Sequence, residues 1–251
     1  MVDRLLRWRL IGERRPADIL ALDVDPAMTA AAETAFASRR KELAQRGVTV
    51  RFACQSLADA AKTEAGQFDL VLAHHVLDLL DLNEAVPMLR ALAAPGAVFW
   101  LTLTFDGQTR WLPPLDRRLD TLIETAYHVT MDGRDGSRHS LAGRRLPALI
   151  RAAGGLVAVA GGSNWRVTPV AGRYRNGERV VLQAMLNFHR TALAGEVPSE
   201  LLDRWLAERE AQLGEGRLGL VVHHRDVAGW FDPSSTVVQP TSVPSATPND
   251  R

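Results

Sequence analysis

The sequence predicts an α/β fold with a mostly parallel sheet and helical insertions. Two observations carry this prediction. Short, almost uninterrupted apolar runs of strand length recur through the first 104 residues, and segments with helical spacing of apolar residues separate them. Strands have this continuous apolar character when helices cover a parallel sheet on both faces. After residue 104 the alternation loosens into longer helical segments.

The first half of the chain predicts strands and helices in alternation. Residues 1–11 carry apolar side chains at helical spacing, and the run DILALD at 18–23 has the length of a strand. Asp25 is a suitable cap for the next helix, with Pro26 as its first residue and Gly47 as its stop. Further strands are expected at 48–53, 68–74 and 97–104, with a loop after the first of these and a helix over Leu82–Leu92 before the last.

The second half of the chain contributes more helix than strand. Helices are expected around 115–130 and 140–153, then near 177–194 and 199–213. Short strands are expected at 156–160 and 217–224. We therefore expect one domain over residues 1–231, followed by a disordered tail over 232–251, which is rich in Pro, Ser and Thr.

The composition excludes several classes of function. The net charge of +1 argues against nucleic acid or an anionic membrane as a partner. No apolar run approaches the roughly 20 residues that span a bilayer, and arginines interrupt the apolar residues of the N-terminus, unlike a signal peptide. Cys54 is the single cysteine, so we expect a buried structural thiol, no intrachain disulfide and a cytoplasmic location.

Candidate ligand-binding residues follow the first two strands, because ligands bind beyond the carboxyl ends of strands in open α/β sheets. Asp23 ends the first strand, where a carboxylate can accept hydrogen bonds from both hydroxyls of a ribose. Asp25 is expected to cap the helix, which leaves Asp23 for the ligand. After the second strand, a polar and an apolar residue, Ser56 and Leu57, could meet and cover an adenine ring.

Two histidines, His74 and His75, follow the third strand. A histidine can act as a general base near neutral pH, although a structural role is the alternative for each of them. Adjacent residues at a strand end point in opposite directions, so the pair is not expected to bind one metal ion. The sequence contains no GxSxG, P-loop, HExxH or CxxC motif, and we predict no metal site.

Three segments together resemble class I S-adenosylmethionine-dependent methyltransferases. ILALDVDPAM resembles the second-strand motif of that family, FDLVLAHHVLDLL its fourth-strand motif, and LRALAAPGAVFWLTLT the helix, turn and fifth strand that follow. The three motifs occur in the family's order and spacing within residues 1–104. The resemblance implies a Rossmann-like sheet.

The resemblance also implies S-adenosyl-L-methionine as the cofactor and a small molecule as the substrate. Insertions at about 105–153 and 163–215 would supply the substrate region. Much of the catalysis in this family is alignment of the nucleophile, so catalytic residues vary. The implied roles are Asp23 at the ribose, Val24 beside the adenine, Ser56 and Leu57 near the adenine edge, His74 near the methionine end, and His75 as the candidate base.

Compared with the family, the chain lacks the first strand and the glycine-rich GxGxG turn before Met1. We therefore expect an N-terminally truncated methyltransferase, through a shortened gene product or a misplaced start, in which methyl transfer is impaired. Two alternatives stay open. One is an NAD-type Rossmann oxidoreductase, because a strand-end acid serves it equally. The other is a non-catalytic methyltransferase remnant that acts as a binding module. The oligomeric state is not predicted.

Overall fold

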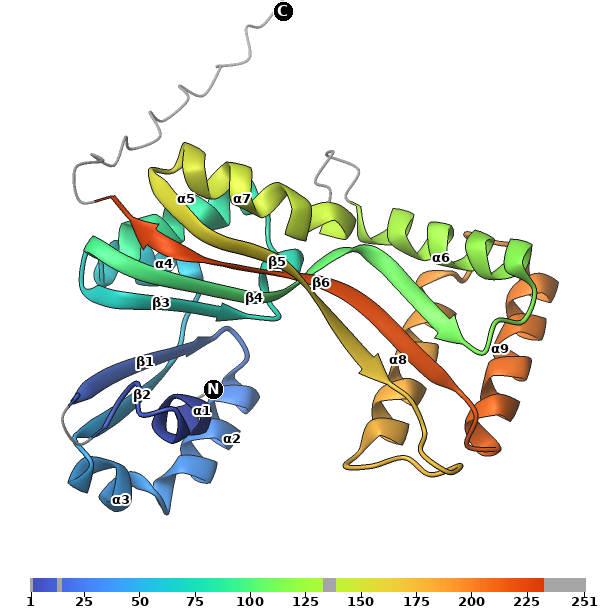
Figure 1. Ribbon diagram of the computed structural model, residues 1–251, viewed down its shortest axis with the longest axis horizontal. Coiled ribbons are helices and arrows are strands. Elements are labelled where there is room, and N and C mark those ends of the chain that lie inside the picture. The colour runs from blue at the N-terminus through green and yellow to red at the C-terminus, as the bar shows by residue number, and fades with distance from the viewer. Residues whose placement is uncertain (1, 13–14, 133–138, 233–251) are drawn as a thin grey trace, which may run out of the picture. The chain divides into compact units, whose positions relative to one another are not determined.

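The structure is a computed structural model that describes residues 2–12, 15–132 and 139–232. The chain divides into two compact units, residues 1–65 and 66–251, and each is described by itself. Figure 1 shows helices and strands alternating along the chain, which confirms the α/β fold class. The predicted tail lies outside the described residues from residue 233 onward, and one domain over 1–231 stays a prediction. Within the described ranges, no helix is long and apolar enough to cross a membrane.

The first unit is built on two parallel strands, which pair from Ala17 with Val48 to Asp23 with Cys54. Its small core contains Leu6, Leu43 and Val48. Asp25 caps the helix after the first strand as predicted, accepting a hydrogen bond from the Ala27 N–H at 2.7 Å. The elements are α1 (Val2–Arg7), β1 (Ala17–Asp23), α2 (Pro26–Ala37), α3 (Arg40–Gln45), β2 (Val48–Cys54) and α4 (Leu57–Thr63).

Two helical details of the first unit differ from the prediction. The single helix expected up to Gly47 is two helices, because the chain breaks at Ser38 and Arg39. Helix α2 buries none of its side chains, whereas α3 brings Leu43 into the core. The loop expected after β2 contains helix α4, in whose first turn the Asp59 N–H donates to the Ser56 hydroxyl. A Ser followed three residues later by an acid is a known start signal for a helix.

The second unit has a four-stranded sheet in the order β3-β4-β6-β5 (Figure 1). Strands β3 and β4 are parallel, and β6 runs antiparallel to both β4 and β5. Its elements are β3 (Phe68–His74), the 3-10 turn η1 (Leu77–Leu79), α5 (Leu82–Leu92), β4 (Ala93–Leu112), α6 (Arg117–Met131), the 3-10 turn η2 (His139–Leu141), α7 (Ala142–Ala152), β5 (Gly155–Val167), α8 (Glu178–Ala192), α9 (Ser199–Gly214) and β6 (Gly219–Phe231).

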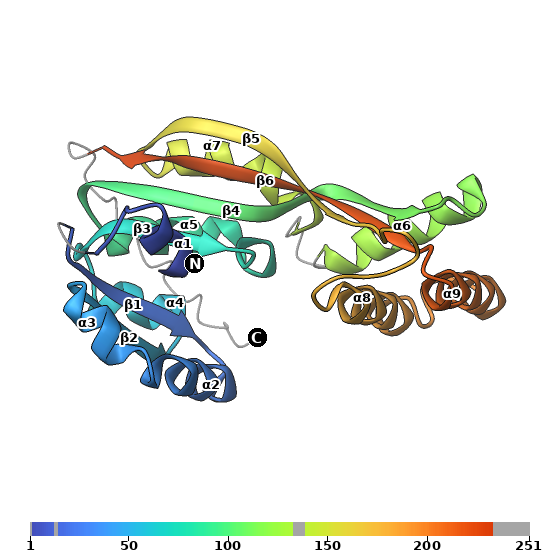
Figure 2. The ribbon, with the colours of Figure 1, turned by 60° about the horizontal axis from the view of Figure 1, so that its bottom comes forward.

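Three strands of this sheet are much longer than predicted. Strand β4 spans 20 residues, and β5 and β6 span 13 each. The polar stretch after Thr104 was expected to be a connection. It belongs to the sheet instead, because it pairs with β6, and the last pair is Leu112 with Gly219. Two register shifts in β4 accommodate it. Figure 2 shows these strands continuing toward α6, α8 and α9.

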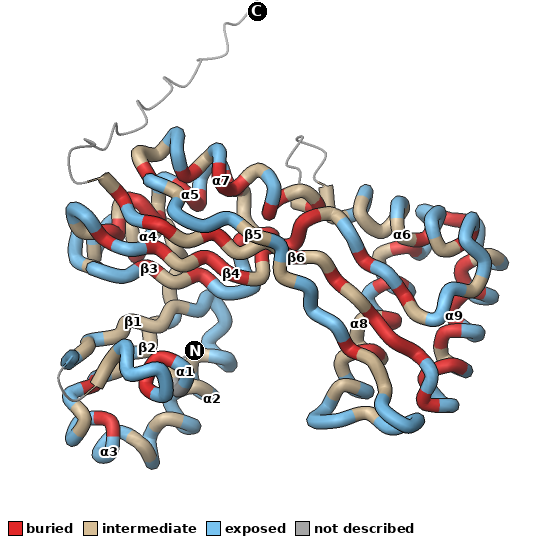
Figure 3. The backbone as a smooth tube through the Cα atoms, in the orientation of Figure 1, coloured by how far each residue is buried: buried red, intermediate tan, exposed pale blue. Residues whose placement is uncertain are grey.

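The second unit buries two groups of apolar side chains, seen as separate red regions along the strands and helices in Figure 3. One lies in the part of the sheet that α5 and α7 accompany, where Phe99 contacts Phe231 with ring centroids 5.0 Å apart. The other lies at the outer end of the sheet, around the fully buried Trp205. The outer group also contains Trp111, Ile123, Leu182, Leu186, Leu206 and Leu220.

Replacing Gly229 with Ala should destabilise the protein by about 1–3 kcal/mol, the usual cost of overpacking. A Cβ atom at Gly229 would lie 1.9 Å from the carbonyl oxygen of Leu156 and 2.7 Å from Cζ of Phe99. Gly161→Ala is the matched control, since nothing lies within 4 Å of the Cβ that it adds. Urea unfolding measures both variants, and equal stability of the two would contradict this packing.

Candidate functional site

In the first unit, the residues predicted to bind the cofactor follow two neighbouring strands. The Gln55 N–H donates to the carbonyl oxygen of Asp23 at 3.0 Å, so the segments after β1 and β2 leave the sheet at the same edge. Asp23 is exposed, and its Oδ1 accepts a hydrogen bond from the Asp25 N–H at 2.9 Å. Within the described part of the chain, no hydrogen bond engages Asp23 Oδ2, which leaves that oxygen available to a ligand.

A hollow of about 140 Å³ lies beside Asp23. The side chain of Met28 and the ring of Phe52 give it apolar walls, and Thr29 adds a hydroxyl group. Val24, the next residue along the chain, is 70% exposed. A carboxylate beside exposed apolar surface suits a ligand with a polar sugar and a flat ring.

The residues after β2 have other contacts. The Ser56 hydroxyl accepts from the Asp59 N–H at 3.1 Å and donates to Asp59 Oδ2 at 2.7 Å, so it already serves as the cap of α4. Leu57 begins that helix and is half-buried. Cys54 is exposed, which corrects the expectation of a buried thiol: it is the last residue of β2, where the strand leaves the small core.

In the second unit, His74 and His75 contact different residues. His74 Nδ1 lies 2.6 Å from the Thr102 hydroxyl on the neighbouring strand. The His75 N–H donates to the Thr102 carbonyl oxygen at 2.9 Å, and His75 has a left-handed backbone with φ of 57°. The His75 ring lies edge-on to His224, with centroids 5.4 Å apart.

Two buried polar residues near His75 were not identified from the sequence. Asp78 is 8% exposed, and burial raises the pKa of its carboxyl, while the charges of His75 and His139 act against that rise. His224 is 1% exposed, and burial lowers its pKa to about 4, so the ring is neutral at pH 7. The available signal for Asp78 was an acid inside the apolar run VLDLL.

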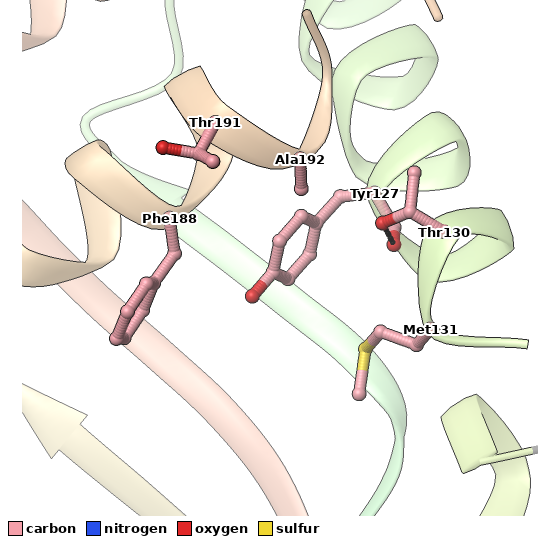
Figure 4. Close-up of a pocket in the computed structure, with 6 residues that line it drawn as sticks. All are labelled: Tyr127, Thr130, Met131, Phe188, Thr191 and Ala192. Carbon is pink, nitrogen blue, oxygen red and sulfur yellow. Dashed lines mark hydrogen bonds between the residues drawn. The ribbon is translucent and has the colours of Figure 1, made fainter.

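At the outer end of the sheet, a groove of about 480 Å³ lies between α6 and α8 (Figure 4). Tyr127, Thr130 and Met131 line it from α6, and Phe188, Thr191 and Ala192 line it from α8. The Tyr127 ring stacks on His189 with centroids 3.9 Å apart. Burial lowers the pKa of His189 to about 4. The six residues that line the groove present apolar surface and hydroxyl groups, and none of them is charged.

A buried carboxylate on β4, that of Asp106, connects this strand to α7 and β6. Asp106 is 2% exposed, and its Oδ1 accepts from Arg144 Nε at 3.0 Å. Arg225 donates to Asp106 Oδ2 through Nη2 at 3.0 Å and Nε at 3.2 Å. Both oxygens are therefore engaged by the chain itself. Across the described ranges, no group of His, Cys, Asp and Glu residues is arranged to hold a metal ion.

Residues 6–101 match the family model described as a methyltransferase domain. This match confirms the expected resemblance over that segment of the chain. The matched residues contain β1 with Asp23 and β3 with His74. No curated protein matches the chain.

Several solved structures are similar to this chain at low identity. A proposed methyltransferase from Bacillus halodurans is 11% identical with a TM-score of 0.48, and the match covers 92% of this chain and 99% of that one. A proposed type II methyltransferase from Anaeromyxobacter dehalogenans is 21% identical with a TM-score of 0.46, covering 92% and 96%. Phosphoethanolamine N-methyltransferase 2 from Haemonchus contortus is 12% identical with a TM-score of 0.40, covering 92% and 52%. These values carry no information about the substrate of this chain.

Lowering the pH should destabilise the protein through its buried histidines. His189 and His224 have pKa values of about 4 when folded, against about 6.5 when unfolded, so the unfolded state binds protons more readily. The stability that they contribute is complete above about pH 6.5 and is lost as the pH falls toward about 4, by about 3 kcal/mol for each residue.

Urea unfolding between about pH 6 and about pH 5 should therefore show that these two residues take up about 1.5 to 1.8 protons on unfolding. The control is His189→Phe, which keeps an aromatic ring beside Tyr127 and should remove about one of these protons. An unchanged proton uptake in that variant would contradict the assignment of a neutral His189.

Proposed function

We propose that this protein transfers the methyl group of S-adenosylmethionine to a small-molecule acceptor. The observation that carries the proposal is the methyltransferase match over residues 6–101, which includes the strand ends bearing Asp23 and His74. The two open alternatives, an oxidoreductase and a non-catalytic binding module, have no comparable observation in their favour.

On the cofactor side, we assign the ribose hydroxyls to Asp23. Its exposed carboxylate has an oxygen that no hydrogen bond engages within the described residues, and a carboxylate oxygen can accept from a hydroxyl donor. Val24 is exposed beside it and offers an apolar surface to the adenine. Leu57 and Ser56 are assigned to the adenine edge, although the Ser56 hydroxyl would have to keep its capping bonds there. His74 is assigned to the methionine end.

On the acceptor side, we assign His75 as the base and the insertions at 105–153 and 163–215 as the substrate region. Helix α6 lies in the first insertion and α8 in the second, and together they form the uncharged groove around Tyr127. The lining suits the apolar part of a small molecule with a few hydrogen-bonding groups, which is the usual character of a small-molecule site.

The bound cofactor supplies an activated methyl group on a positively charged sulfur. The chain's own residues then have three tasks: Asp23 anchors one end of the cofactor, the outer helices orient the acceptor, and His75 accepts a proton from it. Orientation alone can lower the barrier of such a displacement by several kcal/mol, so the fixed sheet that carries His75 is central to the proposal.

Isothermal titration calorimetry of the chain with S-adenosylmethionine should show saturable binding, and Asp23→Asn should weaken that binding by about 1–3 kcal/mol, because hydrogen bonds to a carboxylate are lost. Asp18→Asn is the matched control, since Asp18 lies on the same strand and bonds to Thr49 instead.

A parallel titration with NAD separates the alternatives. Binding of NAD without S-adenosylmethionine would favour the oxidoreductase, and binding of neither would favour the non-catalytic module. Equal affinity of the Asp23→Asn and wild-type proteins would remove Asp23 from the site.

A further inference from the structure

A cluster of positive charge lies where α7, β4 and β6 of the second unit meet. Arg144 on α7 donates to Asp106 through Nε, which lies 3.0 Å from Oδ1, and through Nη2, which lies 3.0 Å from the backbone carbonyl oxygen. Arg225 on β6 donates to Oδ2 of the same residue through Nη2 at 3.0 Å and Nε at 3.2 Å. Within the described part of the chain, Asp106 is the one acid that pairs with either arginine. One carboxylate neutralises one guanidinium, so the cluster carries an excess of positive charge.

The cations of this cluster face solvent, and the acid lies beneath them. The Asp106 side chain is 2% exposed, against 54% for Arg144 and 29% for Arg225. A guanidinium has five N–H donors, and each arginine uses two of them on Asp106. The other N–H groups of both arginines have no acceptor among the described residues. A molecule that approaches the cluster therefore meets hydrogen-bond donors and positive charge, and it does not contact the buried carboxylate.

An irregularity in β4 places Asp106 beneath the arginines. Strand β4 pairs with β6 at Phe105 and again at Gln108, and its register shifts between them, where Asp106 and Gly107 lie. A bulge of this kind redirects a side chain. Gly107 has a φ of 79°, and a Cβ atom there would lie 3.2 Å from Nη2 of Arg144. The backbone of β4 is therefore shaped for this contact.

Further close contacts hold the cluster in one arrangement. A Cβ atom on Gly143 would lie 2.9 Å from Cβ of Asp106 and 3.0 Å from Cβ of Arg225, so the lack of a side chain lets α7 approach both strands. His223 adds an imidazole, whose Nε2 lies 3.7 Å from Asp106 Oδ2 and whose Nδ1 lies 2.6 Å from Oδ1 of Asn164 on β5. Side chains that are held in this way lose little conformational freedom when a ligand binds.

The cluster is separate from the contact between His75 and His224. His223 and Arg225 are the neighbours of His224 in β6, and successive side chains of a strand point to opposite faces of the sheet. The His224 ring contacts His75, with centroids 5.4 Å apart. The arginines therefore do not belong to the residues assigned to the cofactor or to the proton transfer.

We infer that Arg144 and Arg225 form a binding site for the oxyanion group of a small molecule, a phosphate or a carboxylate. Both groups present pairs of oxygen atoms that accept two N–H donors of one guanidinium at once, and such charge-assisted bonds are among the strongest in proteins. Asp106 does not touch the ligand and acts as a positioning residue for the two arginines. This site is additional to the proposed function and does not depend on it.

Isothermal titration calorimetry of the protein without S-adenosylmethionine tests the site, with inorganic phosphate as one probe and acetate as the other. Sodium chloride keeps the ionic strength constant, so that general screening is the same in both titrations. We expect saturable binding at one site. Tighter binding of phosphate identifies a phosphate ester as the ligand class, and tighter binding of acetate identifies a carboxylate. Absence of saturable binding of both probes overturns the inference.

Arg144→Gln should weaken the binding of the preferred probe by about tenfold or more, because charge-assisted hydrogen bonds are lost. Arg151→Gln is the matched control, since it removes the same charge from the same helix about 10 Å further along α7, where Arg151 donates to the Pro147 carbonyl oxygen. It should change the affinity by less than about twofold. Equal losses in the two variants would show general charge attraction and overturn the site. Circular dichroism checks that both variants fold.

A second measurement needs no substitution. Phenylglyoxal modifies guanidinium groups, and mass spectrometry reads the rate at each arginine separately. Inorganic phosphate should slow the modification of Arg144 and Arg225 several-fold and leave the rate at Arg151 unchanged. Equal protection of all three arginines, or of none, contradicts the site even if Arg144→Gln does not fold. Both measurements use the protein without cofactor, so their outcome is independent of whether S-adenosylmethionine binds.

Discussion

Strand β6 is the constraint on which the second unit depends. It is the central antiparallel partner of β4 and β5 over its whole length. Its first half places Leu220 and Val222 in the outer core, and its second half places Val227 and Phe231 in the sheet that α5 and α7 accompany. One strand therefore carries both groups of buried side chains. The outer part of the sheet cannot separate from the inner part without breaking backbone hydrogen bonds of β6, each of which is costly to lose when buried.

The register shifts in β4 are held by two acids. Asp226 accepts from the Leu103 N–H and the Ser163 hydroxyl, both at 2.8 Å, while Asp106 is held by Arg144 and Arg225. Buried carboxylates are tolerated only when paired and hydrogen-bonded, and Asp106 meets this condition through its two arginines, while Asp226 is partly exposed and hydrogen-bonded. Bulges of this kind bend a strand and redirect its side chains. The direction of Phe105 and the surroundings of His224 therefore follow from interactions that have no catalytic part themselves.

Local signals predicted the fold where they were unambiguous. The strand at 68–74 and the helix over Leu82–Leu92 have the predicted bounds. In each case the spacing of the apolar residues fits one type of secondary structure only. The predicted lengths of β4, β5 and β6 were wrong, since the parts of these strands that the sequence pattern missed are stabilised by pairing between segments more than 50 residues apart. Local propensity contains no information about such pairing. The strand-end residues Asp23 and His75 were identifiable from the pattern, whereas Asp78 and His224 needed the burial and neighbours that only the fold provides.

The histidines differ in their surroundings in the fold, although the sequence pattern alone does not distinguish their roles. His189 and His224 are buried and neutral, and their rings serve packing and electrostatic environment. His75 is exposed in a strained conformation beside one of them. Rings in contact continue from His75 through His224, Phe105 and His128 to Tyr127 in the α6–α8 groove, with successive centroids 5.4, 6.3, 5.2 and 6.4 Å apart. The proposed base and the proposed acceptor groove are thus joined by one row of packed rings, in which Phe105 and His224 lie opposite each other on the paired strands β4 and β6. This gives a physical reason for the outer helices to be built on extended strands instead of a flexible linker.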